Sequence, residues 1–160
     1  MGSRFYHFPL MGMKEDRLFS QWETGIVTHS AKETEAVAAT FAQSLPPDLI
    51  LTLAGDLGVG KTTFVRGLAR GLGIEEDITS PSFALLHVYQ GKRQLLHIDA
   101  YRLKQSSSFD DLMVWDIAQS PWNMVIEWPE RVADRLPADH WKMKATILAD
   151  GSHRFTLTRP

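Results

Sequence analysis

One stretch of the sequence, residues 49–68 (LILTLAGDLGVGKTTFVRGL), constrains the fold more than any other. Residues 55–62 of it (GDLGVGKT) match the phosphate-binding pattern G-x-x-x-x-G-K-[ST] in full. An apolar run of strand length precedes these residues, called the P-loop below, and apolar residues at helical spacing follow them. The sequence therefore predicts a strand, a glycine-rich loop and a helix in direct succession.

The glycine spacing has a physical reason. Glycine adopts backbone dihedrals that are closed to other residues, so successive N–H groups of such a loop can point into one concavity. With the positive end of the following helix, these donors suit a nucleoside di- or triphosphate. We expect Lys61 to neutralise β/γ-phosphate oxygens and the Thr62 hydroxyl to ligate Mg²⁺. The expected nucleotide-binding residues of this stretch are Asp56, Leu57, Gly58, Val59, Gly60, Lys61, Thr62 and Thr63.

Composition limits what else the chain can be. At 160 residues, with 44% hydrophobic and 22% charged side chains, it can bury one ordinary core. It contains no cysteine, which excludes disulfides and thiolate metal sites. The net charge is −2 without runs of like charge, so tight binding of RNA or DNA by the isolated chain is not predicted. No apolar run reaches the ~18 residues of a membrane helix, and we expect a cytoplasmic protein.

Periodicity and turn residues predict the remaining elements. We divide the chain into a poorly patterned N-terminal extension, residues 1–21, and a P-loop domain, residues 22–160. A capping box at Ser30–Glu33 predicts a helix start. The expected class is α/β, a three-layer P-loop NTPase-like domain with a mixed parallel and antiparallel sheet. Beyond the P-loop unit we expect strands over 22–29, 83–89, 93–99, 123–127, 141–149 and 153–158, a loop over 102–110, a short helix over 109–118 and a helical turn over 129–135.

Two apolar strands end in an acid, at Asp99 and at Glu127. Hydrolysis of a triphosphate needs a second anchor for Mg²⁺ and a group that orients the attacking water. Because ligands of such sheets gather beyond the carboxyl ends of the strands, both acids are expected to face the phosphates. We expect Asp99 to hold Mg²⁺ through a water and Glu127 to orient or deprotonate the nucleophile; the alternative for each is a turn cap or an ion pair. His97 points to the same side of its strand as Asp99, and both a packing role and a site role stay open for it.

Three further residues are candidates for contact with the nucleotide. Ser80 and Ser82 lie between the P-loop helix and the next strand. A hydroxyl there can reach the γ-phosphate or Mg²⁺ and order the segment when triphosphate binds, or it can serve a local turn instead. Trp128 adjoins Glu127 in sequence and is expected to cover the nucleotide.

Four strings in this order, GDLGVGKTTFVRGLARGLG, SPSF, HIDAYRL and VIEWPER, resemble the TsaE (YjeE) family of small P-loop ATPases of bacterial tRNA threonylcarbamoyladenosine synthesis. The resemblance covers roughly residues 25–158. It implies that Lys61 and Thr62 are the Walker A lysine and the Mg²⁺ ligand, and that Asp99 is the Walker B-like acid. It also implies that Glu127 and Trp128 are the family's acid–tryptophan pair.

The resemblance implies a function as well. The chain would be a Mg²⁺-dependent ATPase, weak alone, that docks on a dimer of TsaB- and TsaD-type proteins and supports multiple turnovers of threonylcarbamoyl transfer to adenosine 37 of tRNA. It would meet tRNA only indirectly. Where the family usually reads SPTF this chain reads SPSF, so Ser82 keeps the hydroxyl.

Two alternatives remain open from the residues. One is a nucleotide-gated adaptor with negligible hydrolysis, which fits slow turnover when transition-state charge must come from outside. The other is a small-molecule kinase, although the chain has no arginine-rich lid segment. A GTPase is not expected, because the sequence contains neither D-x-x-G nor N-K-x-D.

Overall fold

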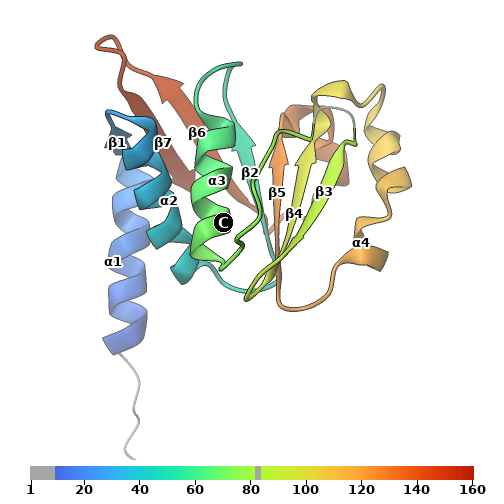
Figure 1. Cartoon of the computed structure of the whole chain (residues 1–160), viewed down its shortest axis with the longest axis horizontal. Helices are drawn as coiled ribbons and strands as arrows, with labels where there is room; N and C mark the ends of the chain where they lie inside the picture. Colours follow the sequence, from blue (N-terminus) through green and yellow to red (C-terminus); the bar gives the residue numbers. More distant parts are fainter. Residues whose placement is uncertain (1–9, 82–83) are drawn as a thin grey trace, which may run out of the picture.

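A mixed seven-stranded sheet organises the computed structural model, which describes residues 10–81 and 84–160 (Figure 1). Its strands are β1 Ile26–Thr28, β2 Leu49–Ala54, β3 Leu86–Gln90, β4 Gln94–Asp99, β5 Trp122–Glu127, β6 Trp141–Ile147 and β7 His153–Thr158. Their order in the sheet is β1-β7-β6-β2-β5-β4-β3. Strands β6, β2, β5 and β4 run parallel to one another, whereas β7 is antiparallel to β1 and β6, and β3 is antiparallel to β4.

Helices and 3₁₀ turns cover the two faces of this sheet. Helices α1 (Leu10–Thr24), α2 (Ala31–Ser44) and α3 (Lys61–Gly71) lie on one face (Figure 1). The other face packs against α4 (Val114–Ile117), the 3₁₀ helix Ser106–Leu112, and Val132 and Leu136, which flank the 3₁₀ helix Ala133–Arg135. The remaining 3₁₀ helices are Ala100–Arg102 and Pro129–Arg131. The predicted three-layer α/β class with a mixed sheet is confirmed, and no described helix is long and apolar enough to cross a membrane.

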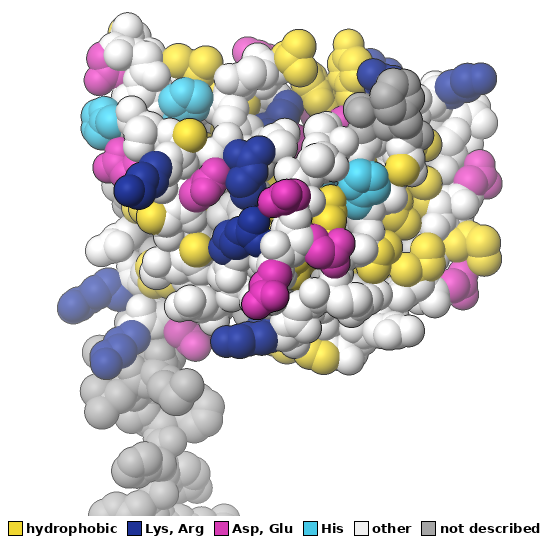
Figure 2. All heavy atoms as spheres, viewed as in Figure 1, with side chains coloured by type: hydrophobic (Ala, Val, Ile, Leu, Met, Phe, Trp, Pro, Cys, Tyr) yellow, Lys and Arg dark blue, Asp and Glu magenta, His cyan; other side chains and the backbone are white. Residues whose placement is uncertain are grey.

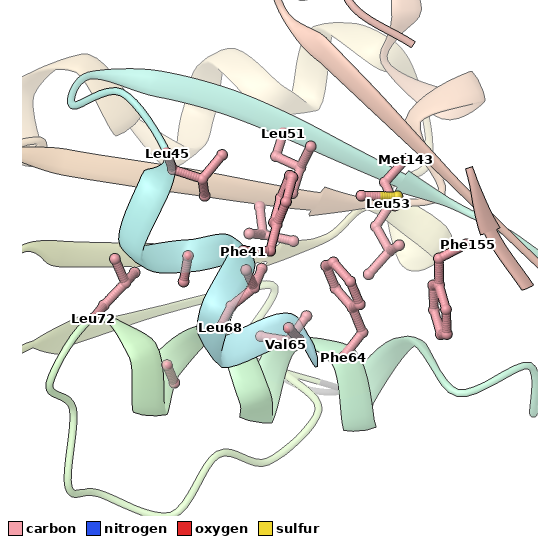
Figure 3. Packing of buried hydrophobic residues seen from close by; sticks show 14 of the residues in the cluster. Phe41, Leu45, Leu51, Leu53, Phe64, Val65, Leu68, Leu72, Met143 and Phe155 are labelled. Carbon is pink, nitrogen blue, oxygen red and sulfur yellow. The ribbon is translucent and has the colours of Figure 1, made fainter. Parts of the chain in front are cut away.

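The main core lies between the sheet and the three longer helices, and Figure 3 shows the part of it that packs against α2 and α3. Phe41 of α2, Phe64 of α3 and Phe155 of β7 are fully buried there. The ring centroids of Phe64 and Phe155 are 5.1 Å apart, in a stacked arrangement. Because Phe64 belongs to the first turn of α3, this contact fixes the start of that helix against the sheet. Because the P-loop leads directly into α3, this core contact also fixes the end of the P-loop against the sheet.

Helices α2 and α3 pack closely against each other. The helix start predicted at Ser30 is confirmed, with the Glu33 amide donating to Ser30 Oγ at 3.1 Å, while the Glu33 carboxylate accepts from the His29 amide at 2.6 Å instead of from Ser30. Gly67 lies at the contact, where a Cβ atom would come within 2.5 Å of the Glu35 carbonyl oxygen. No side chain fits between the two backbones at this point, so the glycine sets the distance between the helices.

The segment before β1 differs from the prediction. Residues 22–24 end helix α1 instead of belonging to a strand over 22–29, and the predicted domain boundary after residue 21 falls inside this helix. Trp22 is 2% exposed and its ring centroid lies 4.7 Å from that of Phe41. Phe19 packs against the same ring from one turn earlier. Burial of these aromatics stabilises the helix, and Gly25, with φ 119°, ends it.

The segment between β4 and β5 also differs from the prediction. The expected loop over 102–110 contains 3₁₀ helices, and the expected helix over 109–118 is divided in two. Phe109 is buried against the second face of the sheet and anchors the first piece. Met113 adopts a left-handed conformation with φ 53°, which interrupts helical hydrogen bonding and leaves α4 as a single turn.

Candidate functional site

The P-loop joins β2 to α3 at the carboxyl end of the central strands (Figure 1). Its backbone needs glycine at three points, Gly55 with φ 154°, Gly58 with φ 79° and Gly60 with φ 100°. Gly60 is also the residue that caps α3, and no side chain caps the first N–H groups of the helix there. The positive end of an eleven-residue helix is therefore available at the loop.

A cavity of about 290 Å³ lies beside this helix start. It is lined by Leu57, Gly58, Gly60, Lys61, Thr62, Thr63, Ser80, Asp99, Glu127 and Trp128. All of these residues were predicted from the sequence to lie at the site, and they come from four separate segments of the chain. Two larger cavities, of about 460 and 500 Å³, occur elsewhere, but the P-loop glycines border neither.

Three other predicted residues, Asp56, Val59 and Ser82, are not among the described residues that line the cavity. The Asp56 carbonyl oxygen accepts a hydrogen bond from the Val59 amide at 3.2 Å, so both residues take part in the turn of the loop itself. The Val59 side chain is buried, 2% exposed, and belongs to the main core. Ser82 lies outside the described residues.

Lys61 is a buried cation at the centre of the cavity wall. It is 6% exposed, and its ammonium group donates to the Gly55 carbonyl oxygen. The indole ring of Trp128 lies over the same group, with Nζ 3.8 Å from the ring centroid. Burial lowers the pKa of Lys61 below the usual lysine value, although Glu127, Asp99 and other nearby carboxylates act in the opposite direction. An anion placed here would gain a partly desolvated positive charge.

Trp128 adopts an unusual backbone conformation directly after β5. Its φ of 56° is left-handed, which is strained for a bulky side chain. The strained turn brings the indole back over the cavity, where its centroid lies 4.9 Å from that of Tyr101. The Arg131 guanidinium lies 5.5 Å from the Tyr101 ring centroid on a neighbouring turn. Trp128 thus forms one wall beside the Lys61 ammonium, and Tyr101 packs against its ring.

The two predicted acids end neighbouring parallel strands in register. Asp99 of β4 pairs with Glu127 of β5, so both side chains lie at the same edge and on the same face of the sheet. Asp99 Oδ1 accepts a hydrogen bond from the Tyr101 amide at 3.0 Å, so this acid caps a 3₁₀ turn as well as lining the cavity. Glu127 is only 3% exposed, and its Oε2 lies 2.9 Å from Nε2 of His97.

The oxygen donors at the cavity do not form a metal cage by themselves. Within residues 10–81 and 84–160, no three His, Cys, Asp or Glu side chains group together as a cage would require. The lining instead offers a hydroxyl from Thr62 and a carboxylate from Asp99. One or two such ligands, with phosphate oxygens and waters, are what Mg²⁺ uses in nucleotide sites. The residues present therefore fit a cation that is shared with a phosphate ligand.

His153 is a contributor that the sequence did not reveal. From β7 its Nδ1 donates a hydrogen bond to the Val59 carbonyl oxygen at 2.6 Å, which fixes the middle of the P-loop. The imidazole lies directly beside Gly60, where a Cβ atom would approach Nδ1 to 3.1 Å. The two bonded residues are 94 positions apart, and no local pattern links them. The pairing of β7 with β6, and of β6 with β2, brings them together.

Comparisons with known proteins show what this chain is similar to. The model of the family described as "Threonylcarbamoyl adenosine biosynthesis protein TsaE" matches residues 28–154. A protein from Treponema pallidum named tRNA threonylcarbamoyladenosine biosynthesis protein TsaE is 41% identical over 131 residues, 82% of this chain and 97% of that protein. The protein of that name from Bacillus subtilis is 34% identical over 132 residues, 82% of each. A crystal structure of Bacillus subtilis YdiB superposes with a TM-score of 0.69 at 31% identity and covers 84% of both chains.

Proposed function

Because this chain belongs to the TsaE family of tRNA threonylcarbamoyladenosine biosynthesis, we propose that it binds Mg²⁺-ATP at the P-loop cavity and hydrolyses it to support that modification. One observation carries the proposal. The cavity brings together the P-loop, the open start of α3, a buried lysine and two strand-end acids. Each of these elements suits a triphosphate or the hydrolysis of one.

Lys61 and the loop would bind the phosphates. Lys61 is desolvated, and its ammonium group donates a hydrogen bond to a carbonyl of its own loop. Phosphate oxygens are a better partner for an ammonium than a neutral carbonyl. Binding would therefore redirect Lys61 towards the β- and γ-phosphates and reverse the lowering of its pKa. Gly58, Gly60 and Thr63, which line the cavity, would border the same phosphates.

Thr62 and Asp99 would hold the metal ion between them and the phosphates. When bound, Mg²⁺ neutralises negative charge that develops on the phosphate oxygens. The hydrogen bond from the Tyr101 amide to Asp99 Oδ1 holds this carboxylate at the end of β4. Asp99 therefore keeps its position before any ligand arrives, which lowers the cost of ordering the site.

Glu127 would act on the attacking water. The water oxygen bonds to the γ-phosphorus while the bond from that phosphorus to the β,γ-bridging oxygen breaks, which gives ADP and inorganic phosphate. One proton of the water passes to the Glu127 carboxylate and then to solvent. Trp128 and Ser80 line the same cavity and would exclude bulk water from the phosphates.

Partner proteins would complete the activity. No arginine is among the residues that line the cavity in the described part of the chain, so transition-state charge beyond Lys61 and the metal would come from outside. We propose a complex with TsaB- and TsaD-type proteins in the cytoplasm, in which tRNA is held by the partners. The charge distribution agrees with tRNA being held by the partners, since acidic and basic side chains are interspersed on the face shown in Figure 2 and the net charge is −2.

The same lack of a lining arginine favours a second candidate, a nucleotide-gated adaptor with negligible hydrolysis. The two are separated by measuring ATP turnover of this chain alone and with the two partner proteins. An ATPase predicts turnover that rises when the partners are added and is lost in Lys61→Ala. An adaptor predicts ATP-dependent complex formation without turnover in either condition.

A test in cells addresses the pathway. Cells that lack this protein should be deficient in threonylcarbamoyladenosine on tRNA, and the wild-type gene should restore it. Restoration by the wild type but not by Lys61→Ala would tie the modification to the P-loop cavity. Normal modification in cells without the protein would contradict the assignment.

A further inference from the structure

A buried histidine lies behind the strand-end acid to which we assign the attacking water. His97 of β4 is 0% exposed, and Glu127 of β5 is 3% exposed. Their closest atoms, Nε2 and Oε2, are 2.9 Å apart. In the parallel register His97 pairs with Val125, so Glu127 lies two residues further along the neighbouring strand, on the same face. The acid therefore leans back from the sheet edge to reach the histidine.

In the contact between His97 and Glu127, the shared proton lies on the histidine. A carboxylate oxygen only accepts hydrogen bonds, so Nε2 of His97 must be the donor. The other ring nitrogen, Nδ1, is buried and has no hydrogen-bond partner among the described residues. All the polar contact that this ring makes there is directed at Glu127. The tautomer is thus set by the acid.

Packing alone does not explain such a pair. Leu95 and Val125, on the same face of the two strands, are buried apolar residues of the main core. An apolar pair in place of His97 and Glu127 would avoid the cost of removing polar groups from water, and such replacements are often neutral or stabilising. A buried polar pair at the edge of a ligand cavity, with one nitrogen unsatisfied, is instead typical of a functional site.

We infer that His97 is a positioning residue for Glu127. Its Nε2–H holds Oε2, which fixes the carboxylate beside the P-loop cavity that Glu127 lines and leaves its other oxygen, Oε1, outside this contact. A glutamate side chain without this donor would rotate about its terminal torsion, which is broad and roughly two-fold. The contact therefore keeps one oxygen ready for the attacking water at each turnover. This inference rests on the proposed ATP hydrolysis.

The test compares the leucine and glutamine variants of His97. His97→Leu removes the donor but suits the apolar surroundings, so the fold should persist in a thermal melt. Its kcat for ATP hydrolysis, measured with the partner proteins, should fall by about 10- to 100-fold. The Kd for Mg²⁺-ATP should change by less than about threefold, because the phosphate-binding groups are untouched. His97→Gln places an amide N–H near the position of Nε2 and should recover most of the lost kcat.

Two comparisons exclude a merely structural effect. His87→Leu alters the histidine that faces His97 across β3 and β4 and bonds Tyr89, outside the cavity lining; its kcat should equal that of the wild type. In a Glu127→Gln background, His97→Leu should lower kcat no further, because the residue acts through that carboxylate.

The outcomes are distinct. A wild-type protein that hydrolyses no ATP with its partners would overturn the proposed function and this inference with it. Hydrolysis by the wild type with an unchanged kcat in His97→Leu, no recovery in His97→Gln, or an equal further loss in the Glu127→Gln background would overturn the inference alone.

Discussion

The two ends of β5 both carry a buried polar side chain, but the hydrogen bonding around the two side chains differs. At the amino end, Asn123 is 1% exposed and fully paired: its Nδ2 donates to the Pro46 carbonyl oxygen at 2.9 Å, and its Oδ1 accepts from Arg93 at 3.3 Å. At the carboxyl end, Glu127 bonds His97, whose Nδ1 lacks a partner within the described residues.

The residues around the two ends of β5 show the same difference in hydrogen bonding and strain. Near Asn123, the buried Gln94 side chain both donates, to the Ile117 carbonyl oxygen, and accepts, from the Gln119 amide. Near Glu127, Lys61 is buried with a lowered pKa and Trp128 has a strained backbone. Polar residues at the amino end form hydrogen bonds that join separate chain segments. Residues at the carboxyl end are buried or strained at a cost in free energy that a bound ligand can reduce. The comparison predicts where a substitution should change function and where it should change stability.

The largest expected effect is loss of ATP binding in Lys61→Met. The substitution removes a charge and hydrogen bonds worth about 1.5–3 kcal/mol each, so affinity for Mg²⁺-ATP should fall by at least about 100-fold. Titration calorimetry measures this directly. The control is Lys92→Met, an exposed lysine on the turn between β3 and β4 at the opposite end of β4, which should bind as the wild type does. Unchanged affinity in Lys61→Met would contradict the site assignment.

The same variant tests the cost of burying Lys61. Because burial lowers its pKa in the folded state, the charged form opposes folding at neutral pH. That cost is present in full below the folded pKa and is lost as pH rises towards the unfolded lysine value. Lys61→Met should therefore unfold at a temperature equal to or above that of the wild type at pH 7. The difference between the two should shrink towards about pH 10. A clearly lower melting temperature at pH 7 would contradict this view of the carboxyl end.

The second prediction separates the two acids. Glu127→Gln should spare Mg²⁺-ATP binding and lower turnover with the partner proteins by about 100-fold, because the water loses its proton acceptor. Asp99→Asn should weaken binding by about tenfold when Mg²⁺ is present, since one charge–charge contact to the metal is lost, and should have little effect without it. Equal behaviour of the two variants would contradict the division of roles.

The third prediction concerns the amino end of β5. Asn123→Ala removes two hydrogen bonds, the one from Nδ2 to the Pro46 carbonyl oxygen and the one from Arg93 to Oδ1, although Arg93 keeps its bond to the Leu45 carbonyl oxygen. Each of these hydrogen bonds contributes about 0.5–1.5 kcal/mol, so urea unfolding should show a clear decrease in the free energy of unfolding. Affinity for Mg²⁺-ATP, measured on the folded variant, should not change. A folded Asn123→Ala variant with weakened ATP binding would break the distinction between the two ends.

The sequence predicted best those features that depend on neighbouring residues. The P-loop, the helix start at Ser30 and both hairpins are local, and the structure contains all of them. The strand-end acids were found because parallel strands end at one edge. Trp22 was placed wrongly in a strand, because its helix depends on burial against Phe41 and Phe64, which follow later in the chain. The bond from His97 to Glu127 needs the register of two strands, which no local pattern gives.

His153 shows the same limit and gives the smallest expected effect. Its single hydrogen bond to the Val59 carbonyl oxygen is worth about 0.5–1.5 kcal/mol, so His153→Leu should weaken Mg²⁺-ATP binding by about 2- to 10-fold. Turnover at saturating ATP should stay unchanged, because the acids keep their positions. His153→Asn retains a donor near Nδ1 and should restore affinity.

The control for this variant lies near the amino end of β6. His140 Nδ1 also donates to a carbonyl oxygen, that of Pro137, at 2.6 Å. Pro137, unlike Val59, does not belong to the P-loop, and neither His140 nor Pro137 lines the P-loop cavity. His140→Leu removes a bond of the same kind and should leave ATP affinity as it is. If both histidine variants weakened binding equally, the effect of His153 would be a general loss of stability. If only His153→Leu did so, the shape of the phosphate loop at the carboxyl end of β5 would depend on a hydrogen bond from strand β7.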